Sequence, residues 1–385
     1  MNNDINNYNR LIALNGFARL HKGNALMSRR VVVAMSGGVD SSVAAALLKE
    51  KGYEVIGVTM KTWSEEVPHG ETARLICYGP GDEEDARMVA QILEIPLYTL
   101  DVTKEYKAEV IDYFCQEYSL GRTPNPCIRC NRKVKFEALT NKVRSLGIEF
   151  DYFATGHYAK IEYNKDKQRY VLKKARDITK DQSYFLFSLS QEQLGCSLFP
   201  LGDHTKKDAK RMASHLGLGV ENKPESQDFV LGDYSSLIGA AQPGPILNKQ
   251  GKVLGRHQGI PFYTIGQRKR LGISAGEPLY VTSISRENNA IVVGTKEDVY
   301  ADELIASELN WVAIQGLRQP IEVKAKIRYL HQGAEAVITP LDDGKVYVKF
   351  EEPQKAIAPG QAVVFYQGEE VLGGGIIERS ATNLY

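Results

Sequence analysis

The chain has 385 residues, more than a single ordinary core accommodates, so its length predicts two or three domains. Hydrophobic residues make up 43% and charged residues 25% of it, as in globular proteins. No stretch approaches the roughly 18 uninterrupted apolar residues of a membrane span. The net charge of +1 excludes a surface that is cationic throughout, but it leaves room for local basic patches.

Residues 1–26 are rich in asparagine and contain no apolar segment of the kind a secretory signal needs. We expect a disordered extension there, with Met27 as an alternative start directly before the first strand-like run. Five cysteines in the chain are too few for a disulfide scaffold. A reducing, cytoplasmic location is therefore the expectation.

The next part of the chain alternates short apolar runs with helical stretches. The strand-like runs are "VVVAM", "EVIGVTM" and "PLYTLDV", the helical ones are "SSVAAALLKEKG" and "DEEDARMVAQILEI", and "DYFATGHY" supplies a further strand. This alternation predicts a parallel sheet that is covered by helices on both faces. We therefore predict a doubly wound α/β domain over residues 27–220, with a helical insertion near 104–146.

Two β-rich domains are predicted after it. Glycine and proline punctuate short segments between residues 221 and 304, which favours a small, mostly β central domain. Apolar and polar residues alternate more regularly over residues 305–385, and "AEAVITPLDDGKVYVKF" contains an Asp-Asp-Gly turn. The pattern there is typical of an antiparallel sandwich or barrel, and we expect a C-terminal β-barrel.

The stretch "VVVAMSGGVDSS" leads from a strand through two glycines into a helix. It lacks the lysine of a Walker loop, so an anion would be bound by backbone N–H groups and the positive end of the helix. Mg²⁺ would neutralise phosphate charge, with Asp40 as a candidate ligand, directly or through water. A Gly-Gly pair alone would equally suit a simple strand-to-helix turn.

A second motif, "GRTPNPCIRCNRKVKF", places Cys127 and Cys130 in a basic context. Metal binding, redox exchange and sulfur carriage all use C-x-x-C, and the motif alone does not choose among them. Residues 121–144 contain seven Lys or Arg against one acid, Glu137. We expect the nearest cations to stabilise a thiolate, namely Arg129, Arg132 and Lys133.

These strings carry a family resemblance. "SGGVDSS" after a strand resembles the pyrophosphate loop of the N-type ATP pyrophosphatases, which split ATP between its α and β phosphates. With "GRTPNPCIRCNRKVKF", "ATGHYAK", "KDQSYFLFSLSQEQL", "FPLGD", "YTIGQRKRLGI" and "PGQAVVFYQGEEVLGGGII", the chain from about 29 to 380 resembles the tRNA-specific 2-thiouridylases. The resemblance implies ATP-dependent 2-thiolation of the wobble uridine of certain tRNAs.

The resemblance also implies roles for particular residues. Cys130 matches the catalytic cysteine, and the target-base contact matches Asn125, Pro126 and Cys127. The positions that bind ATP in the family correspond to Ala34, Met35, Ser36, Gly37, Gly38, Val39, Asp40, Ser41, Met60 and Gly156. The contacts to tRNA match His157, Lys180, Asp181, Gln182, Arg328, Tyr329 and Gln361. Considered one at a time, these residues also fit ordinary structural roles: core residues, solvated surface charges, a structural histidine or turn residues.

One segment departs from the family pattern. Many members carry a second catalytic cysteine where this chain has "PESQDFVLGDY", with Asp228 and Val230 around the matching place. Cys77, Cys127 and Cys130 could instead ligate a [4Fe–4S] cluster that presents sulfide. Alternatively, Cys127 and Cys130 could act as persulfide bearer and resolving thiol.

The reaction implied is adenylylation of uracil O2, attack of sulfur at C2, and release of AMP after pyrophosphate. The expected partners are the anticodon arm of tRNA, whose target base must leave the stack, and a sulfur donor protein or sulfide, with no membrane involved. Phosphate contacts should make tRNA binding weaken with salt. Two alternatives are an ATP pyrophosphatase acting on a small metabolite and a non-catalytic RNA-binding protein.

Overall fold

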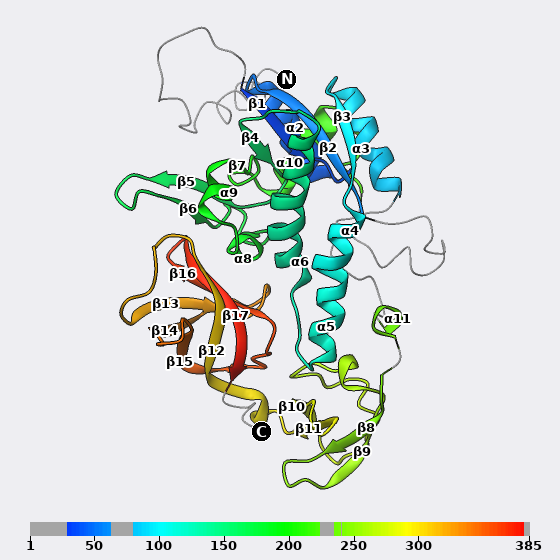
Figure 1. Cartoon of the computed structure of the whole chain (residues 1–385), viewed down its shortest axis with the longest axis vertical. Coiled ribbons are helices and arrows are strands. Elements are labelled where there is room, and N and C mark those ends of the chain that lie inside the picture. The colour runs from blue at the N-terminus through cyan, green and yellow to red at the C-terminus, as the bar shows by residue number, and fades with distance from the viewer. Residues whose placement is uncertain (1–28, 63–79, 224–234, 240, 381–385) are drawn as a thin grey trace.

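The computed structural model describes residues 29–62, 80–223, 235–239 and 241–380 (Figure 1). Its first part contains a five-stranded parallel sheet in the order β3-β2-β1-β4-β7. The strands are β1 (Arg30–Ala34), β2 (Glu54–Lys61), β3 (Leu97–Asp101), β4 (Tyr152–Ala154) and β7 (Ser197–Leu198). Side chains alternate between the faces of a strand, and here Val32 belongs to one core whereas Val31 and Val33 belong to another. Both faces are therefore buried, and the predicted α/β arrangement is confirmed.

Three helices pack against the face of the sheet that holds Val31 and Val33: α2 (Val39–Glu50), α3 (Pro80–Ile92) and α10 (Lys206–His215). The opposite face is covered by the predicted helical insertion. The insertion consists of two runs, α4 (Thr103–Tyr106), η2 (Lys107–Asp112) and α5 (Tyr113–Ser119), then α6 (Pro126–Arg129), η3 (Cys130–Leu139) and α7 (Thr140–Ser145). The segments η2 and η3 are π-helical, which the sequence did not predict.

A small four-stranded sheet follows in the order β10-β11-β8-β9. Its strands are β8 (Gly244–Leu247), β9 (Val253–His257), β10 (Tyr280–Ser285) and β11 (Ala290–Gly294), and it has its own apolar core. The short helix α11 (Ser235–Ile238) precedes it. The loop between α5 and α6 reaches this unit, since Thr123 Oγ1 lies 3.3 Å from Thr264 Oγ1. The insertion thus spans from the parallel sheet to the small sheet, as Figure 1 shows.

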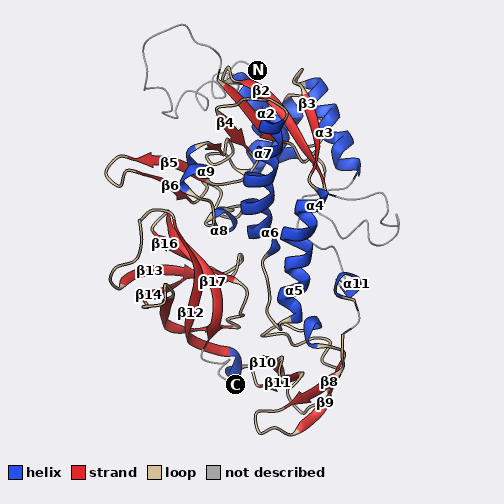
Figure 2. Ribbon diagram, viewed as in Figure 1, coloured by secondary structure: helices blue, strands red, loops and turns tan. Residues whose placement is uncertain are grey.

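The last part of the chain is the antiparallel barrel that the sequence predicted (Figure 2). Six strands close through a pairing between the first and the last: β12 (Tyr300–Trp311), β13 (Ile321–Lys326), β14 (Ala334–Pro340), β15 (Val346–Lys355), β16 (Ala362–Gln367) and β17 (Glu370–Ser380). A hairpin from the first part of the chain, β5 (Lys160–Asn164) and β6 (Arg169–Lys173), extends this sheet where Lys173 pairs with Glu370. Across the described ranges, no helix combines the length and apolarity needed to cross a bilayer.

Candidate functional site

The glycine loop lies between the end of β1 and the start of α2, at the carboxyl edge of the sheet. Gly38 caps α2 in an extended conformation, and the hydroxyls of Ser41 and Ser42 donate to its carbonyl at 3.2 and 2.8 Å. Gly37 has a φ of +66°, and an added Cβ would collide with the carbonyl of Asp82. The loop is therefore tightly wound at the positive end of a 12-residue helix, an arrangement suited to binding an anion.

A lysine from outside the loop supplies the positive charge that its sequence lacks. Lys206, the first residue of α10, donates from Nζ to both carboxylate oxygens of Asp40 at 2.8 and 2.7 Å. Its side chain is only 10% exposed, and the hydroxyl of Tyr158 donates to the same carboxylate at 2.8 Å. Sequence reasoning missed Lys206 and Tyr158, because neither stands at a fixed spacing from the loop.

Met60 lies at the carboxyl end of β2, and Gly156 follows the carboxyl end of β4, on the other side of β1. An added Cβ at Gly156 would stand 2.6 Å from the backbone carbon of Asp40, so the loop after β4 touches the first turn of α2. Met60 is 6% exposed and packs in the core under the insertion. The structure therefore brings Gly156 to the glycine loop, while it places Met60 as a core residue at the end of β2.

The two cysteines of the second motif lie on the first turns of one helix. Asn125 caps this helix by accepting from the backbone N–H of Ile128 at 3.3 Å, and Pro126 occupies its first turn. Cys127 is half-buried and Cys130 is 8% exposed. Residues three apart share a helical face, so the two thiols lie on the same side.

Cys130 has a different electrostatic environment from the one expected. Burial raises the pKa of its thiol, and the charge that opposes this rise is that of Lys135. The ammonium of Lys135 donates to the Asn131 side-chain oxygen at 3.0 Å, and Asn131 donates to the carbonyl of Phe185 at 3.2 Å. Lys135 is thus a further residue that the sequence analysis missed, hidden in a run of similar charges.

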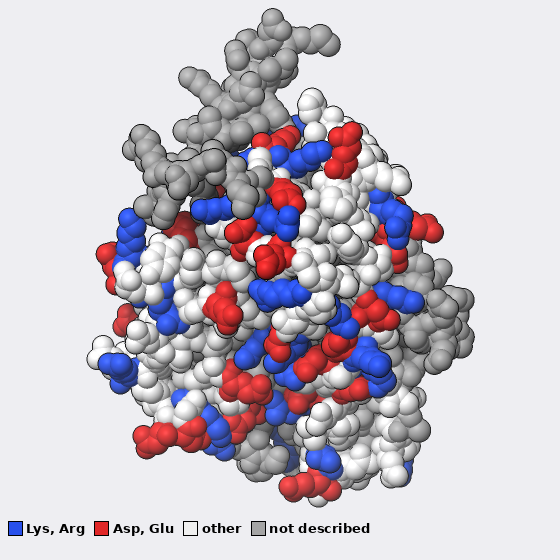
Figure 3. Space-filling view, turned by 45° about the horizontal axis from the view of Figure 1, so that its top comes forward, with Lys and Arg blue, Asp and Glu red and all other residues white. Residues whose placement is uncertain are grey.

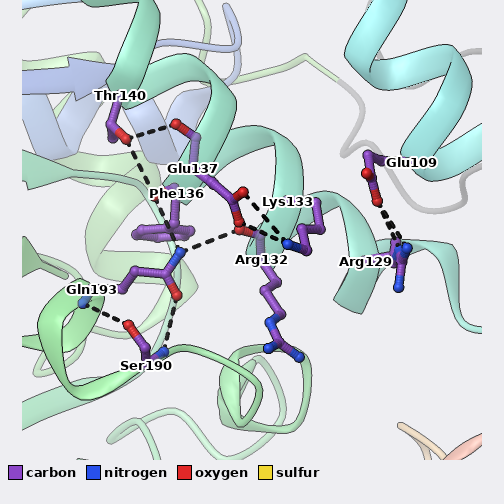
Figure 4. Close-up of polar contacts among 9 residues, drawn as sticks. All are labelled: Glu109, Arg129, Arg132, Lys133, Phe136, Glu137, Thr140, Ser190 and Gln193. Atoms are coloured by element: carbon purple, nitrogen blue, oxygen red, sulfur yellow. Dashed lines mark hydrogen bonds and ion pairs between the residues drawn. The ribbon is translucent and has the colours of Figure 1, made fainter. Parts of the chain in front are cut away.

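For Cys130, the charge that favours the thiolate is that of Lys135 and not that of Arg129, Arg132 or Lys133. Arg129 pairs with Glu109 at 2.9 Å, and Lys133 pairs with Glu137 at 3.1 Å (Figure 4). Arg132 is exposed, and its guanidinium points away from these pairs in the same view. Nearby carboxylates thus hold two of these three cations.

The basic character of the insertion is largely offset in three dimensions. Two more of its cations are paired with acids of the preceding helical run, Arg122 with Glu117 at 2.8 Å and Lys142 with Glu105 at 2.9 Å. Four of the seven Lys and Arg between 121 and 144 therefore have carboxylate partners. Figure 3 shows the same mixing of basic and acidic side chains over the visible face of the molecule.

Two of the residues matched to tRNA contacts lie beside the motifs. His157 follows Gly156, its Nδ1 lies 2.7 Å from the hydroxyl of Thr155, and its ring packs against Phe136 and Phe199. Burial, with the charge of Lys135, holds its pKa well below the ordinary value, so the imidazole is neutral. Gln361 of the barrel donates to the carbonyls of Thr123 and Pro124 at 3.1 Å, directly before Asn125.

The remaining matched residues form two groups. Asp181 is 5% exposed and accepts from the Ser183 hydroxyl at 2.8 Å, while the Gln182 side chain accepts from the backbone of Tyr158 at 2.9 Å. In the barrel, exposed Arg328 donates to the carbonyl of Lys355 at 3.0 Å. Tyr329 stacks on Phe185 with ring centroids 4.5 Å apart. The half-buried Lys180 lies in the turn before Asp181.

The described residues supply two of the three thiols that the cluster hypothesis needs. Cys77 lies outside them, as do residues 1–26 and the "PESQDFVLGDY" segment with Asp228 and Val230. Within the described ranges, no group of three or more His, Cys, Asp or Glu is arranged to hold a metal ion.

The chain is similar to known proteins over almost its whole length. Residues 29–231 match the family described as tRNA methyl transferase HUP domain, residues 234–295 its PRC-barrel domain, and residues 301–377 the aminomethyltransferase beta-barrel domain. It is 49% identical over 361 residues to the tRNA-specific 2-thiouridylase MnmA of Acetivibrio thermocellus, covering 92% of this chain and 100% of that one. The enzyme of the same name from Moorella thermoacetica is 51% identical over 360 residues, covering 91% and 99%.

Among solved structures, the U34-tRNA thiolase NcsA from Methanococcus maripaludis with its [4Fe-4S] cluster shares 18% identity over 61% of this chain and 70% of that one. Its TM-score is 0.34, and at that similarity it carries no argument about this site.

Proposed function

The chain belongs to the tRNA-specific 2-thiouridylase family, and on that premise we propose that it uses ATP to convert the wobble uridine of tRNA to 2-thiouridine. The observation that carries the proposal is the connection between its two motifs. Gly156 abuts Asp40 of the glycine loop, and the ring of the next residue, His157, packs against Phe136 of η3, the segment that begins with Cys130. A phosphate-binding loop and a cysteine linked through this packing suit activation of a substrate followed by transfer of sulfur to it.

Activation of the base takes place at the glycine loop. Uracil O2 attacks the α phosphate of ATP, the bond to the β phosphate breaks, and pyrophosphate leaves. The backbone N–H groups at the start of α2 hold the departing pyrophosphate, and Lys206 supplies cationic charge beside it. Mg²⁺ would enter with ATP; Asp40 is the carboxylate of the loop, and because Lys206 contacts both of its oxygens, a metal ion there would have to displace the ammonium.

Transfer of sulfur takes place at the helix that carries Cys127 and Cys130. A sulfur nucleophile attacks C2 of the adenylylated uracil, and the C2–O2 bond breaks with AMP as the leaving group. The loop that would meet the flipped base is fixed by the Asn125 cap and by Gln361, which holds the carbonyls of Thr123 and Pro124. Cys130 is buried, which protects the reactive sulfur from water.

Sulfur delivery follows one of two routes in this proposal. In the first, one thiol of the Cys127–Cys130 pair receives the outer sulfur of a donor protein's persulfide, and that sulfur attacks C2. The other thiol then attacks the first to release the thiolated base, which leaves a Cys127–Cys130 disulfide for a thiol reductant to reopen; the shared helical face permits this exchange. In the second, they join Cys77 in holding a [4Fe–4S] cluster, which would present sulfide on an open iron site. Anaerobic purification followed by iron and sulfide assays separates the routes, because full activity in metal-free protein contradicts the second.

The decisive experiment is mass spectrometry of tRNA nucleosides after incubation with ATP, Mg²⁺ and either sulfide or a persulfide donor with a thiol reductant. We expect 2-thiouridine to form together with AMP and pyrophosphate. Asp40→Ala should abolish the product while tRNA binding largely persists, and Cys130→Ser should also abolish it. Formation of ADP and orthophosphate, or undiminished turnover by Cys130→Ser, would contradict the proposal.

A further inference from the structure

A second lysine contacts the glycine loop, at Gly37 and not at Asp40. Lys223 lies eight residues after the end of α10, and its Nζ donates to Asp82 at 2.6 Å and to Asp85 at 2.5 Å. The same nitrogen is 3.4 Å from the carbonyl oxygen of Gly37. One ammonium thus joins three segments that are far apart in sequence: the glycine loop, the first turns of α3 and the chain after α10.

The contact between the loop and α3 is close. An added Cβ at Gly37 would collide with the carbonyl of Asp82 and would stand 3.0 Å from the Cβ of Asp85. The left-handed conformation of Gly37, with φ of +66°, is what lets its carbonyl turn toward Lys223 while the loop rests on α3. Lys223 therefore secures the residue on which the shape of the loop depends.

The two carboxylates beside the glycine loop need a cation to balance their negative charge. Two carboxylates beside a phosphate-binding loop repel phosphate, and both are only partly exposed, at 25% and 35% of their side-chain surface. Burial alone would lower the pKa of Lys223, but the hydrogen bonds and charges of Asp82 and Asp85 raise it above the ordinary value. The ammonium therefore stays charged at neutral pH and offsets the acids.

We infer that Lys223 is a positioning residue for ATP: it fixes the carbonyl of Gly37 against α3 and cancels the negative charge that Asp82 and Asp85 would direct at the nucleotide phosphates. This inference rests on the proposed use of ATP by the glycine loop. Lys223 touches the loop and not the reacting atoms, so its effect falls on the affinity for ATP more than on the chemical step.

The test measures equilibrium binding of Mg²⁺-ATP to the full chain without tRNA, together with the thermal unfolding midpoint. Lys223→Met is expected to weaken binding about tenfold. Lys223→Arg should retain most of the affinity, because it keeps the charge. The matched control is Lys49→Met, which removes a lysine that pairs with Glu94 at the far end of α2 and should leave binding unchanged.

A charge-cancelling variant makes the test specific. In Lys223→Met combined with D82N and D85N, the repulsion is absent and ATP affinity should return toward that of the parent chain. D82N/D85N alone should bind ATP at least as tightly as the parent, which gives a readout even where Lys223→Met does not fold. Unchanged binding by folded Lys223→Met, or no recovery in the triple variant, would overturn the inference. No ATP binding by the parent chain would instead refute the proposed function.

Discussion

Lys206 is separated from Asp40 by 166 positions, yet its ammonium contacts both oxygens of that carboxylate. A Walker loop carries its lysine within the loop, whereas here the cation comes from the start of another helix. The pair is partly buried, with 10% of the lysine side chain and 32% of the aspartate side chain exposed, so its field at the loop is only partly screened.

Replacing Lys206 by methionine is expected to lower kcat/KM for ATP about 100-fold, the usual effect of losing one preorganised charge at a reacting phosphate. The measurement is the initial rate of AMP formation at several ATP concentrations. Lys207→Met is the matched control, because its side chain is exposed on the next position of the same helix. Equal losses in the two variants would contradict a role for Lys206 in ATP turnover.

Replacing Lys135 by methionine is expected to raise the pKa of Cys130 further, since burial already raises it and the charge of Lys135 opposes that rise. Alkylation of Cys130 by iodoacetamide, followed by peptide mass spectrometry, should then slow severalfold at a fixed pH near 8, because only the thiolate reacts. Lys133→Met, which removes the partner of Glu137 instead, should alkylate like the parent chain. Identical rates in Lys135→Met and the parent would refute the assignment.

His157 gives a dependence of stability on pH. Its pKa is held well below 6.5 in the folded chain, so below about pH 6.5 the unfolded state binds a proton that the folded state does not. The free energy of unfolding therefore falls as the pH drops below this value, by up to about 1.4 kcal/mol per pH unit from this histidine. Denaturant titrations between pH 7.5 and 5 should show a shallower fall for His157→Gln, and an unchanged slope would contradict the expectation.

At the scale of elements, the sequence predicted four of the five parallel strands, α2, α3 and the barrel strands from β13 to β17, because these segments show apolar runs or apolar–polar alternation. It did not predict β7 or β12. It did not predict the π-helical turns of η2 and η3, since their apolar positions differ little from those of an α-helix. It also missed that the β5–β6 hairpin joins the barrel, because pairing across domains leaves no local pattern. The roles of Lys206 and Lys223 also depend on contacts between residues far apart in the sequence, whereas Lys135 acts on a cysteine five positions before it.

The junction between β4 and α2 provides a test at this scale. Gly156→Ala would place a methyl group 2.6 Å from the backbone of Asp40 and Ser41, so either the loop or the first turn of α2 must move. We expect a loss of about 1–3 kcal/mol in unfolding free energy and a clear loss of ATP binding. Gly316→Ala is the control, since nothing lies within 4 Å of its added Cβ. Equal behaviour of the two variants would show that the junction tolerates the movement.

At the scale of the whole molecule, ion pairs make the surface of the insertion less basic than its count of Lys and Arg suggests. Acids of the first helical run pair with cations of the second, which linear reading of residues 121–144 does not reveal. Attraction for tRNA phosphates therefore depends on the cations that remain available at the surface, of which Arg132 is one.

Arg132→Ala is expected to weaken tRNA binding and to reduce the slope of log K against log salt by about 1, because one phosphate contact is lost. Lys133→Ala should change both less, since its ammonium is already held by Glu137. Filter binding at several salt concentrations measures the two quantities. A larger effect from Lys133→Ala would show that tRNA displaces the internal ion pairs.

The strand β6 carries one further consequence, which concerns the growing chain. Lys167, in the turn before this strand, pairs with Glu370, which comes 203 positions later in the chain. At the usual 5–20 residues per second, a ribosome needs roughly 10–40 s to make that distance. During this interval the hairpin has an unpaired edge. Lysines at positions 160, 167 and 173 carry charge of the kind that discourages such an edge from pairing with a strand of another chain. The strand β6 therefore gains its partner in the barrel only after β17 has been made.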